Sequence, residues 1–214
     1  MPVEQRAKFV TEQQVIATIR EFEQVVEVIY GIYLDSVLGF GLIIEKQNWM
    51  RQQQAEKLHF TSEQSDNSHL IYGVGDPNIP ESYTLHECTL RKLRERNEKD
   101  GLNYKIIGNL CLVLVYQFWE DNCRHKLEDI SGLPRNAILS PLWGDIGHLR
   151  NSIIHKNGIA IDDVNKCSVL TWFKAGEEIS INDKQFEMLI SQVKKELHEL
   201  PQKISDIQSV GTGR

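Results

Sequence analysis

Apolar residues recur every three or four positions from Thr11 to about Gln54, which predicts one long helix with a single apolar stripe. The stripe consists of Val15, Ile19, Phe22, Val26, Ile29 and Tyr33. Gly39 and Gly41 can bend the helix. We expect residues 1–56 to form an N-terminal helix that belongs to a bundle or packs against it.

The stretch from Val25 to Ile44 is about as long and apolar as a membrane span, which needs roughly 20 residues. However, Glu27 and Asp35 lie inside it, and an aspartate at the centre of a bilayer costs about 3 kcal/mol. The sequence therefore favours a long core helix and no membrane association.

Residues 57–80 change in character. Residues 62–68 are polar without any period, and glycines and prolines follow them, so a loop is expected over the whole range. Ser82 or Thr84 can then cap a helix that runs to about Lys99. Its basic run, residues 91–96, predicts either a solvated helix face or a phosphate-binding surface.

A strongly apolar segment from Tyr104 to about Leu127 predicts a central, buried helix. Its second half becomes aromatic and charged. Glu120 and Arg124 lie one turn apart there, so they can pair with each other. Glu120 can equally reach an arginine on a neighbouring helix.

The segment from Asp145 to Asn157 predicts a helix that ends at Gly158, since Asn-Gly favours a left-handed cap. Successive side chains step about 100° around a helix axis. One face of this helix is apolar and carries Ile146, Leu149, Ile153 and Ile154. The other is polar and carries Asp145, His148, Asn151, Ser152 and His155. Arg150 projects from within the apolar sector, where its charge needs a carboxylate, a subunit interface or a ligand phosphate.

The last part of the chain predicts a small β-hairpin and a final helix. Residues 168–173 and 178–181 resemble two short strands joined by a turn. Asn182 or Asp183 can cap an amphipathic helix that Pro201 is expected to end, leaving residues 201–214 as a flexible tail. The fold class expected from the whole pattern is mainly α: an antiparallel helical bundle over residues 81–200 with a late β-hairpin.

Composition narrows the class of protein. The net charge of −6 argues against a protein that coats nucleic acid non-specifically. The four cysteines are scattered without a C-x-x-C pair, which is typical of reduced thiols in the cytosol. The first residues lack the basic and apolar regions of a signal peptide, so a cytoplasmic location is expected.

Arg150, Asn151 and His155 are the strongest candidates for chemistry. Arginine offers a fork of donors suited to phosphate, and histidine is the general acid or base that works near neutral pH. Arg150 and His155 are five residues apart, which is about 140° around a regular helix. They can converge if the helix end deforms, or if a symmetric partner places its own helix opposite.

The segment Arg150-Asn151-Ser152-Ile153-Ile154-His155 resembles the R-x(4–6)-H motif of HEPN domains, in which a polar residue such as asparagine commonly follows the arginine. The flanking residues 144–149 and 156–158, and residues 116–121 on the preceding helix, resemble bacterial members as well. The resemblance covers roughly Tyr104 to Ile161.

The resemblance implies a HEPN-like helical bundle that forms a homodimer. Two such motifs then face each other, and Arg150 and His155 from the two subunits form a composite site. Many members are metal-independent ribonucleases of toxin–antitoxin or phage-defence systems, and others only bind RNA, nucleotide or a protein. By this resemblance Arg150, Asn151 and His155 are catalytic, with Glu120 and His148 in support, and no cofactor is needed. The partners implied are RNA and a nucleotidyltransferase-like antitoxin.

Three alternatives stay open. Arg150 can pair with Glu120 as a packing element. Asp145, His148 and His155 lie along one helix face and can be considered as metal ligands, although the seven-residue histidine spacing matches no zinc pattern. Finally, the domain can be a non-catalytic module that binds RNA, nucleotide or protein.

Overall fold

The structure, a computed structural model, describes residues 3–76 and 78–211. The chain forms two compact units, of which unit 1 comprises Met1–Tyr33 and Ile106–Arg214, and unit 2 comprises Leu34–Lys105. Helix α1 (Val3–Leu58) contributes its first part to unit 1 and the rest to unit 2. The predicted long N-terminal helix is confirmed, and all six residues of its apolar stripe are buried.

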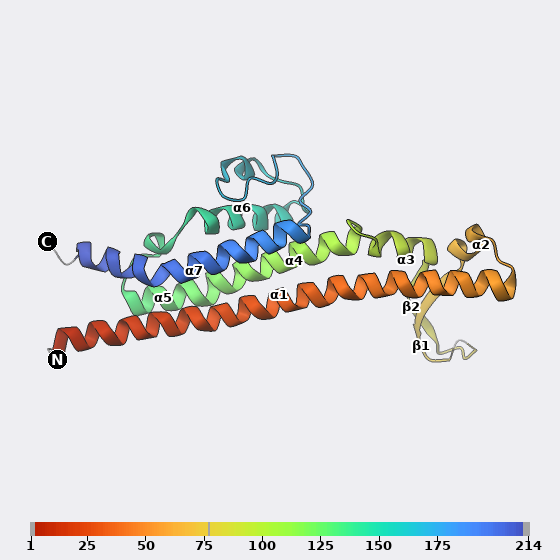
Figure 1. The fold of residues 1–214 in the computed structure, drawn as a ribbon, viewed down its shortest axis with the longest axis horizontal. Helices are drawn as coiled ribbons and strands as arrows, with labels where there is room; N and C mark the ends of the chain where they lie inside the picture. The colour runs from red at the N-terminus through yellow and green to blue at the C-terminus, as the bar shows by residue number, and fades with distance from the viewer. Residues whose placement is uncertain (1–2, 77, 212–214) are drawn as a thin grey trace. The chain divides into compact units, whose positions relative to one another are not determined.

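Unit 1 is a helical bundle (Figure 1). After α1 it contains α4 (Leu102–Phe118) from Ile106 onward, the π-helical turn η1 (Trp119–Cys123), α5 (Arg124–Ser131), the 3-10 turn η2 (Arg135–Ile138), α6 (Pro141–His155), the 3-10 turn η3 (Asp162–Lys166) and α7 (Asp183–Gly211). The predicted buried helix over 104–127 is therefore present as α4, η1 and α5 in direct succession. Wide π-helical turns inside a helix are rare and often lie at functional sites.

Aromatic packing holds the centre of unit 1 together. The rings of Trp119 and Trp143 stack with their centroids 4.1 Å apart, and Phe22 packs against both at 5.7 and 5.9 Å. The Cys111 thiol donates to the Ile29 carbonyl at 3.9 Å. Phe22 of α1 meets Trp119, whereas Ile29, further along α1, meets Cys111, which comes earlier in the second helix. The two helices are therefore antiparallel.

Helix α7 begins as predicted at an Asn182 cap, whose side chain accepts from the Gln185 N–H at 3.0 Å while the Gln185 side chain accepts from the Asn182 N–H. Its predicted end at Pro201 is wrong, because α7 continues through the proline to Gly211. Burial of Leu200 and Ile204 outweighs the missing proline donor. Residues 212–214 of the predicted tail lie outside the described residues.

Unit 2 contains the two-stranded antiparallel sheet of the described chain. Its elements after α1 are α2 (Ser62–Asn67), β1 (His69–Val74), β2 (Tyr83–Thr89) and α3 (Leu90–Asn97). The loop predicted over 57–80 and the helix predicted from Ser82 or Thr84 are therefore wrong in part. Leu70 and Cys88 pair across the strands and pack with Ile43, Leu90 and Leu93, a contact distant in sequence that local patterns do not show.

The β-hairpin predicted late in the chain is wrong. Residues 168–173 and 178–181 form no strands, and the bridge found nearby is an isolated one between Ile159 and Glu178. Hydrogen bonds from the backbone to one side chain replace the bonds between paired strands here. The backbone N–H groups of Ser168, Val169 and Leu170 donate to a buried carboxylate of α6.

Among the described residues, one helical stretch, Thr11–Leu58 of α1, is long and apolar enough to cross a membrane. The core helix of a soluble protein passes the same test, so the finding is weak. Only 11% of its apolar window is buried. The cytoplasmic location stays a prediction.

Candidate functional site

The candidate site lies at the C-terminal end of α6. Pro141 occupies the first turn, where its missing N–H costs nothing, and His155 is the last helical residue. Asn157 and Gly158 both have positive φ, at 52° and 81°, and the Gly158 N–H donates to the Ser152 carbonyl at 3.2 Å. The predicted left-handed helix stop is confirmed.

Asp145 anchors α6 to the segment that follows it. One carboxylate oxygen, Oδ2, accepts the N–H groups of Ser168, Val169 and Leu170 at 2.9, 2.6 and 2.9 Å. The side chain is buried, at 3% exposure. The neighbouring Cys167 thiol donates to the Asp145 carbonyl, and burial together with this carboxylate raises the pKa of that thiol to about 12.

Ser152 fastens the same helix one turn before its end. Its hydroxyl donates to the His148 carbonyl at 2.9 Å and accepts the Ile161 N–H at 3.1 Å. The sequence placed Asp145 and Ser152 on a polar face, but both are buried. Asp145 Oδ2 and the Ser152 hydroxyl bond to backbone groups, so the polar side of α6 is partly structural.

Arg150 leaves α6 on the side that faces α4. One turn earlier, the Tyr116 ring lies 3.1 to 3.3 Å from where a Cβ of Gly147 would be, so the two helices touch at the glycine. Arg150 is half-buried, and its Nε is buried without a hydrogen-bond partner among the described residues. The stem is thus packed while the outer nitrogens remain at the surface.

The three candidate catalytic residues meet within one chain. Arg150 Nη1 donates to Asn151 Oδ1 at 3.1 Å and lies 3.3 Å from His155 Nε2. Asn151 and His155 are exposed, so the cluster opens to solvent. This contact needs no deformed helix end, because the long arginine side chain spans the angular gap of a regular helix. The composite site built from two subunits stays a prediction.

The alternative in which Arg150 pairs with Glu120 is also wrong. Glu120 lies on the π-helical turn and accepts from Arg124 Nη1 at 2.7 Å. Among the described residues, no carboxylate forms an ion pair with Arg150. A guanidinium held only by neutral groups keeps its charge available for an anion.

His148 lies two turns before His155 and is half-buried. Its charged form helps to lower the pKa of the Asp163 carboxyl, after the larger effect of the Lys166 hydrogen bond. No described hydrogen bond joins the His148 ring to Arg150 or His155. Within the described ranges no three His, Cys, Asp or Glu side chains are grouped to hold a metal ion.

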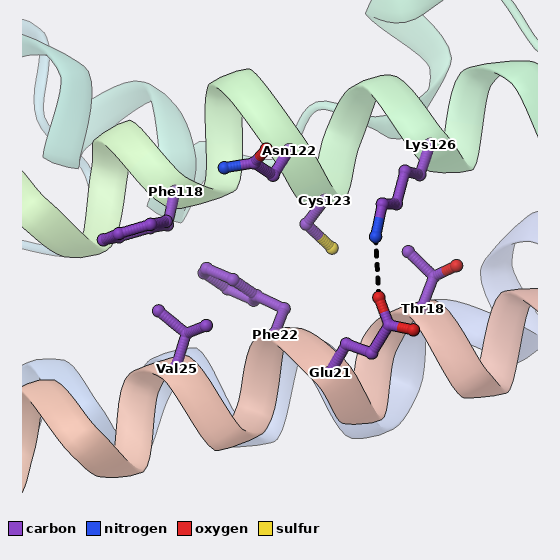
Figure 2. A pocket seen from close by; sticks show the side chains of 8 residues that line it. All are labelled: Thr18, Glu21, Phe22, Val25, Phe118, Asn122, Cys123 and Lys126. Atoms are coloured by element: carbon purple, nitrogen blue, oxygen red, sulfur yellow. Dashed lines mark hydrogen bonds and ion pairs between the residues drawn. The ribbon is translucent and has the colours of Figure 1, made fainter.

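A pocket that the sequence did not predict opens elsewhere in unit 1, between α1 and the π-helical turn (Figure 2). Its volume is about 200 Å³. Its lining residues are Thr18, Glu21, Phe22, Val25, Phe118, Asn122, Cys123 and Lys126. Lys126 donates to Glu21 at 2.7 Å across the opening. The change from apolar to aromatic and polar residues after Tyr116 was the available signal.

Comparisons with protein-family models, with curated proteins and with solved structures find no match to this chain. The function must therefore be argued from the site itself.

Proposed function

We propose that the protein is a metal-independent endoribonuclease of the HEPN type, acting in a toxin–antitoxin or phage-defence setting. The observation that supports it is the exposed contact of Arg150 with Asn151 and His155 at a helix end that Ser152 fastens to Ile161. These residue types supply a phosphate-binding cation, a positioning amide and an acid–base group within about one and a half turns.

In this proposal Arg150 binds the scissile phosphate. The guanidinium has a buried stem, and one outer nitrogen, Nη1, is held by Asn151 and His155, so it is already oriented before RNA arrives. Its charge stabilises the phosphorane-like transition state, in which negative charge grows on the phosphate oxygens.

His155 acts as the general base. Since Arg150 can only donate, the contact between them requires an unprotonated Nε2 on His155, with the proton on Nδ1. That lone pair accepts the proton of a ribose 2′-hydroxyl once phosphate draws the guanidinium away. Asn151 keeps Arg150 oriented or contacts the phosphate directly.

The reaction then proceeds by transfer within the RNA. The 2′-oxygen loses its proton to His155 and attacks phosphorus, the bond from phosphorus to the 5′-oxygen breaks, and that oxygen takes a proton from solvent water as it leaves. The products are a 2′,3′-cyclic phosphate and a free 5′-hydroxyl. None of these steps uses a metal.

RNA cleavage in excess chelator tests this proposal. Arg150→Ala and His155→Ala are each expected to lower the cleavage rate by about 10²- to 10⁴-fold. The matched control is Lys156→Ala, an exposed cation directly after His155 that lies outside the cluster. Wild-type inactivity on a broad set of RNAs, or activity that survives both substitutions, contradicts the assignment.

The second candidate is a non-catalytic module that binds RNA, nucleotide or protein through the same cluster. The net charge of −6 favours a narrow anion site over a broad RNA surface. RNA binding that depends on Arg150 and proceeds without cleavage supports this candidate. The homodimer and a nucleotidyltransferase-like antitoxin partner belong to the proposal in either case.

A further inference from the structure

Helix α4 is apolar on nearly every side, yet one side of it is uncovered. Helices of this kind are normally buried all round. Four large side chains at intervals of four residues remain 38% to 48% exposed: Ile106, Leu110, Leu114 and Phe118. The opposite side, with Leu112 and Val115, is fully buried. The exposed residues form a straight ridge on a helix that is otherwise part of the core.

Helix α1 extends this ridge into a groove. Val25 and Phe118 line the same pocket and point toward each other from the two helices (Figure 2). Val28 and Ile32 follow Val25 on the same side of α1 and are 63% and 47% exposed. We call these three residues of α1 and the four of the α4 ridge the α1–α4 groove.

Charge and area favour one kind of occupant. Among the residues named in the groove none is charged, and at its pocket end Glu21 and Lys126 neutralise each other. The cation at that end, Lys126, is already paired with Glu21, so a nucleic acid would find no unpaired cation among these residues. The exposed fractions leave on the order of 500 Å² of apolar surface, which matches the apolar share of an interface of roughly 800 Å² per partner.

We infer that the α1–α4 groove binds the same groove of a second copy of this chain. A ridge with a four-residue interval packs into the grooves of an identical ridge at a crossing angle of about −50°, the commonest helix-packing class. A two-fold axis near Leu110 and Leu114 brings no like charges together within the ridge. The inference goes beyond the proposed function. Tyr116 of α4 meets α6 on the side of α4 away from the ridge, so this interface does not bring two Arg150 clusters face to face.

Light scattering on the full chain at concentrations from about 1 to about 100 μM tests the groove. The wild type is expected to have a dimer mass in this range. Leu114→Glu and, separately, Leu110→Glu are expected to shift the dissociation constant upward by at least about 100-fold. The matched control is Met188→Glu on α7, a residue with the same 48% exposure as Leu110 but outside the groove, and it should remain dimeric.

A monomeric wild type overturns the inference, as does a dimer that persists in both groove variants while circular dichroism shows them folded. Binding of the wild type to vesicles of phosphatidylcholine and phosphatidylglycerol, lost in Leu114→Glu but retained in Met188→Glu, would assign the groove to a membrane and also overturn it. The nuclease proposal fails separately, when a dimeric wild type does not cleave RNA.

Discussion

Nη1 of Arg150 lies 3.3 Å from Nε2 of His155, five residues later on the same helix. The two residues lie on different sides of α6, and the reach of the arginine side chain closes the gap. Asn151 holds the same nitrogen at 3.1 Å. One chain therefore assembles the cation, the amide and the imidazole of the proposed site without help from a second subunit.

This relationship predicts the outcome of mixing two inactive variants. If Arg150 and His155 act within one chain, subunits carrying Arg150→Ala and His155→Ala each lack half of their own site. Their mixture, refolded together, should cleave RNA no faster than either variant alone. Recovery of roughly a quarter of the wild-type rate, as random pairing would give, means that the two residues act across the subunit interface.

The Asp145 carboxylate predicts a large loss of stability on substitution. Asp145→Ala leaves three backbone donors in the interior without an acceptor, and the free energy of unfolding should fall by about 3 kcal/mol or more. Urea denaturation followed by circular dichroism measures the change. Asp163→Ala removes an exposed carboxylate that pairs with Lys166, and it should change stability far less. Equal effects of the two substitutions would contradict the anchoring role.

Two helix glycines predict opposite effects of the same substitution. A Cβ on Gly108 would lie 2.3 Å from the Ile181 carbonyl oxygen, a backbone atom that cannot move aside cheaply. Gly108→Ala should therefore destabilise the protein by about 1–3 kcal/mol. Gly144 in α6 has nothing within 4 Å of its Cβ position, so Gly144→Ala should stabilise by about 0.5–1 kcal/mol. Thermal melts of both variants check the pair, and a stabilising Gly108→Ala would disprove this packing.

Unit 2 contains an acid-sensitive contact. Arg94 donates two hydrogen bonds to the Asp66 carboxylate, at 2.9 and 3.3 Å, and this contact holds the pKa of that carboxyl below its usual range of about 4. A lowered folded-state pKa gives stability that is complete above the unfolded-state pKa and is lost as the pH falls through the folded-state pKa. Asp66→Asn should therefore destabilise unit 2 near neutral pH and flatten its acid unfolding below about pH 4. Hydrogen exchange of α2 and α3 measures this, and an unchanged acid profile would refute it.

Local patterns were sufficient where a segment folds by its own periodicity and caps. The stripe of α1, the cap of α7 at Asn182 and the stop at Gly158 were all predicted because neighbouring residues determine them. Local sequence patterns gave wrong predictions where a segment is held by residues far away in the sequence. The carboxylate of Asp145 replaces a strand ladder more than twenty residues away, and β1 and β2 pack on a cluster that includes Ile43 of α1.

The candidate site shows the same division. Its residues were identified from spacing and type, since Arg150 stood alone in an apolar sector. The contact between Arg150 and His155 was not predicted from the sequence. Helix angles describe where side chains leave the backbone and not how far a flexible side chain reaches. The pairing of Glu120 with Arg124 was one of two open choices that only tertiary structure decides.

The most direct measurement is the rate of RNA cleavage in excess chelator, with the new ends identified, for wild type, Arg150→Ala and His155→Ala. Wild-type products should carry 2′,3′-cyclic phosphate and 5′-hydroxyl ends, and each variant should cleave about 10²-fold more slowly or worse. Products with other ends, or variants as fast as the wild type, would contradict it.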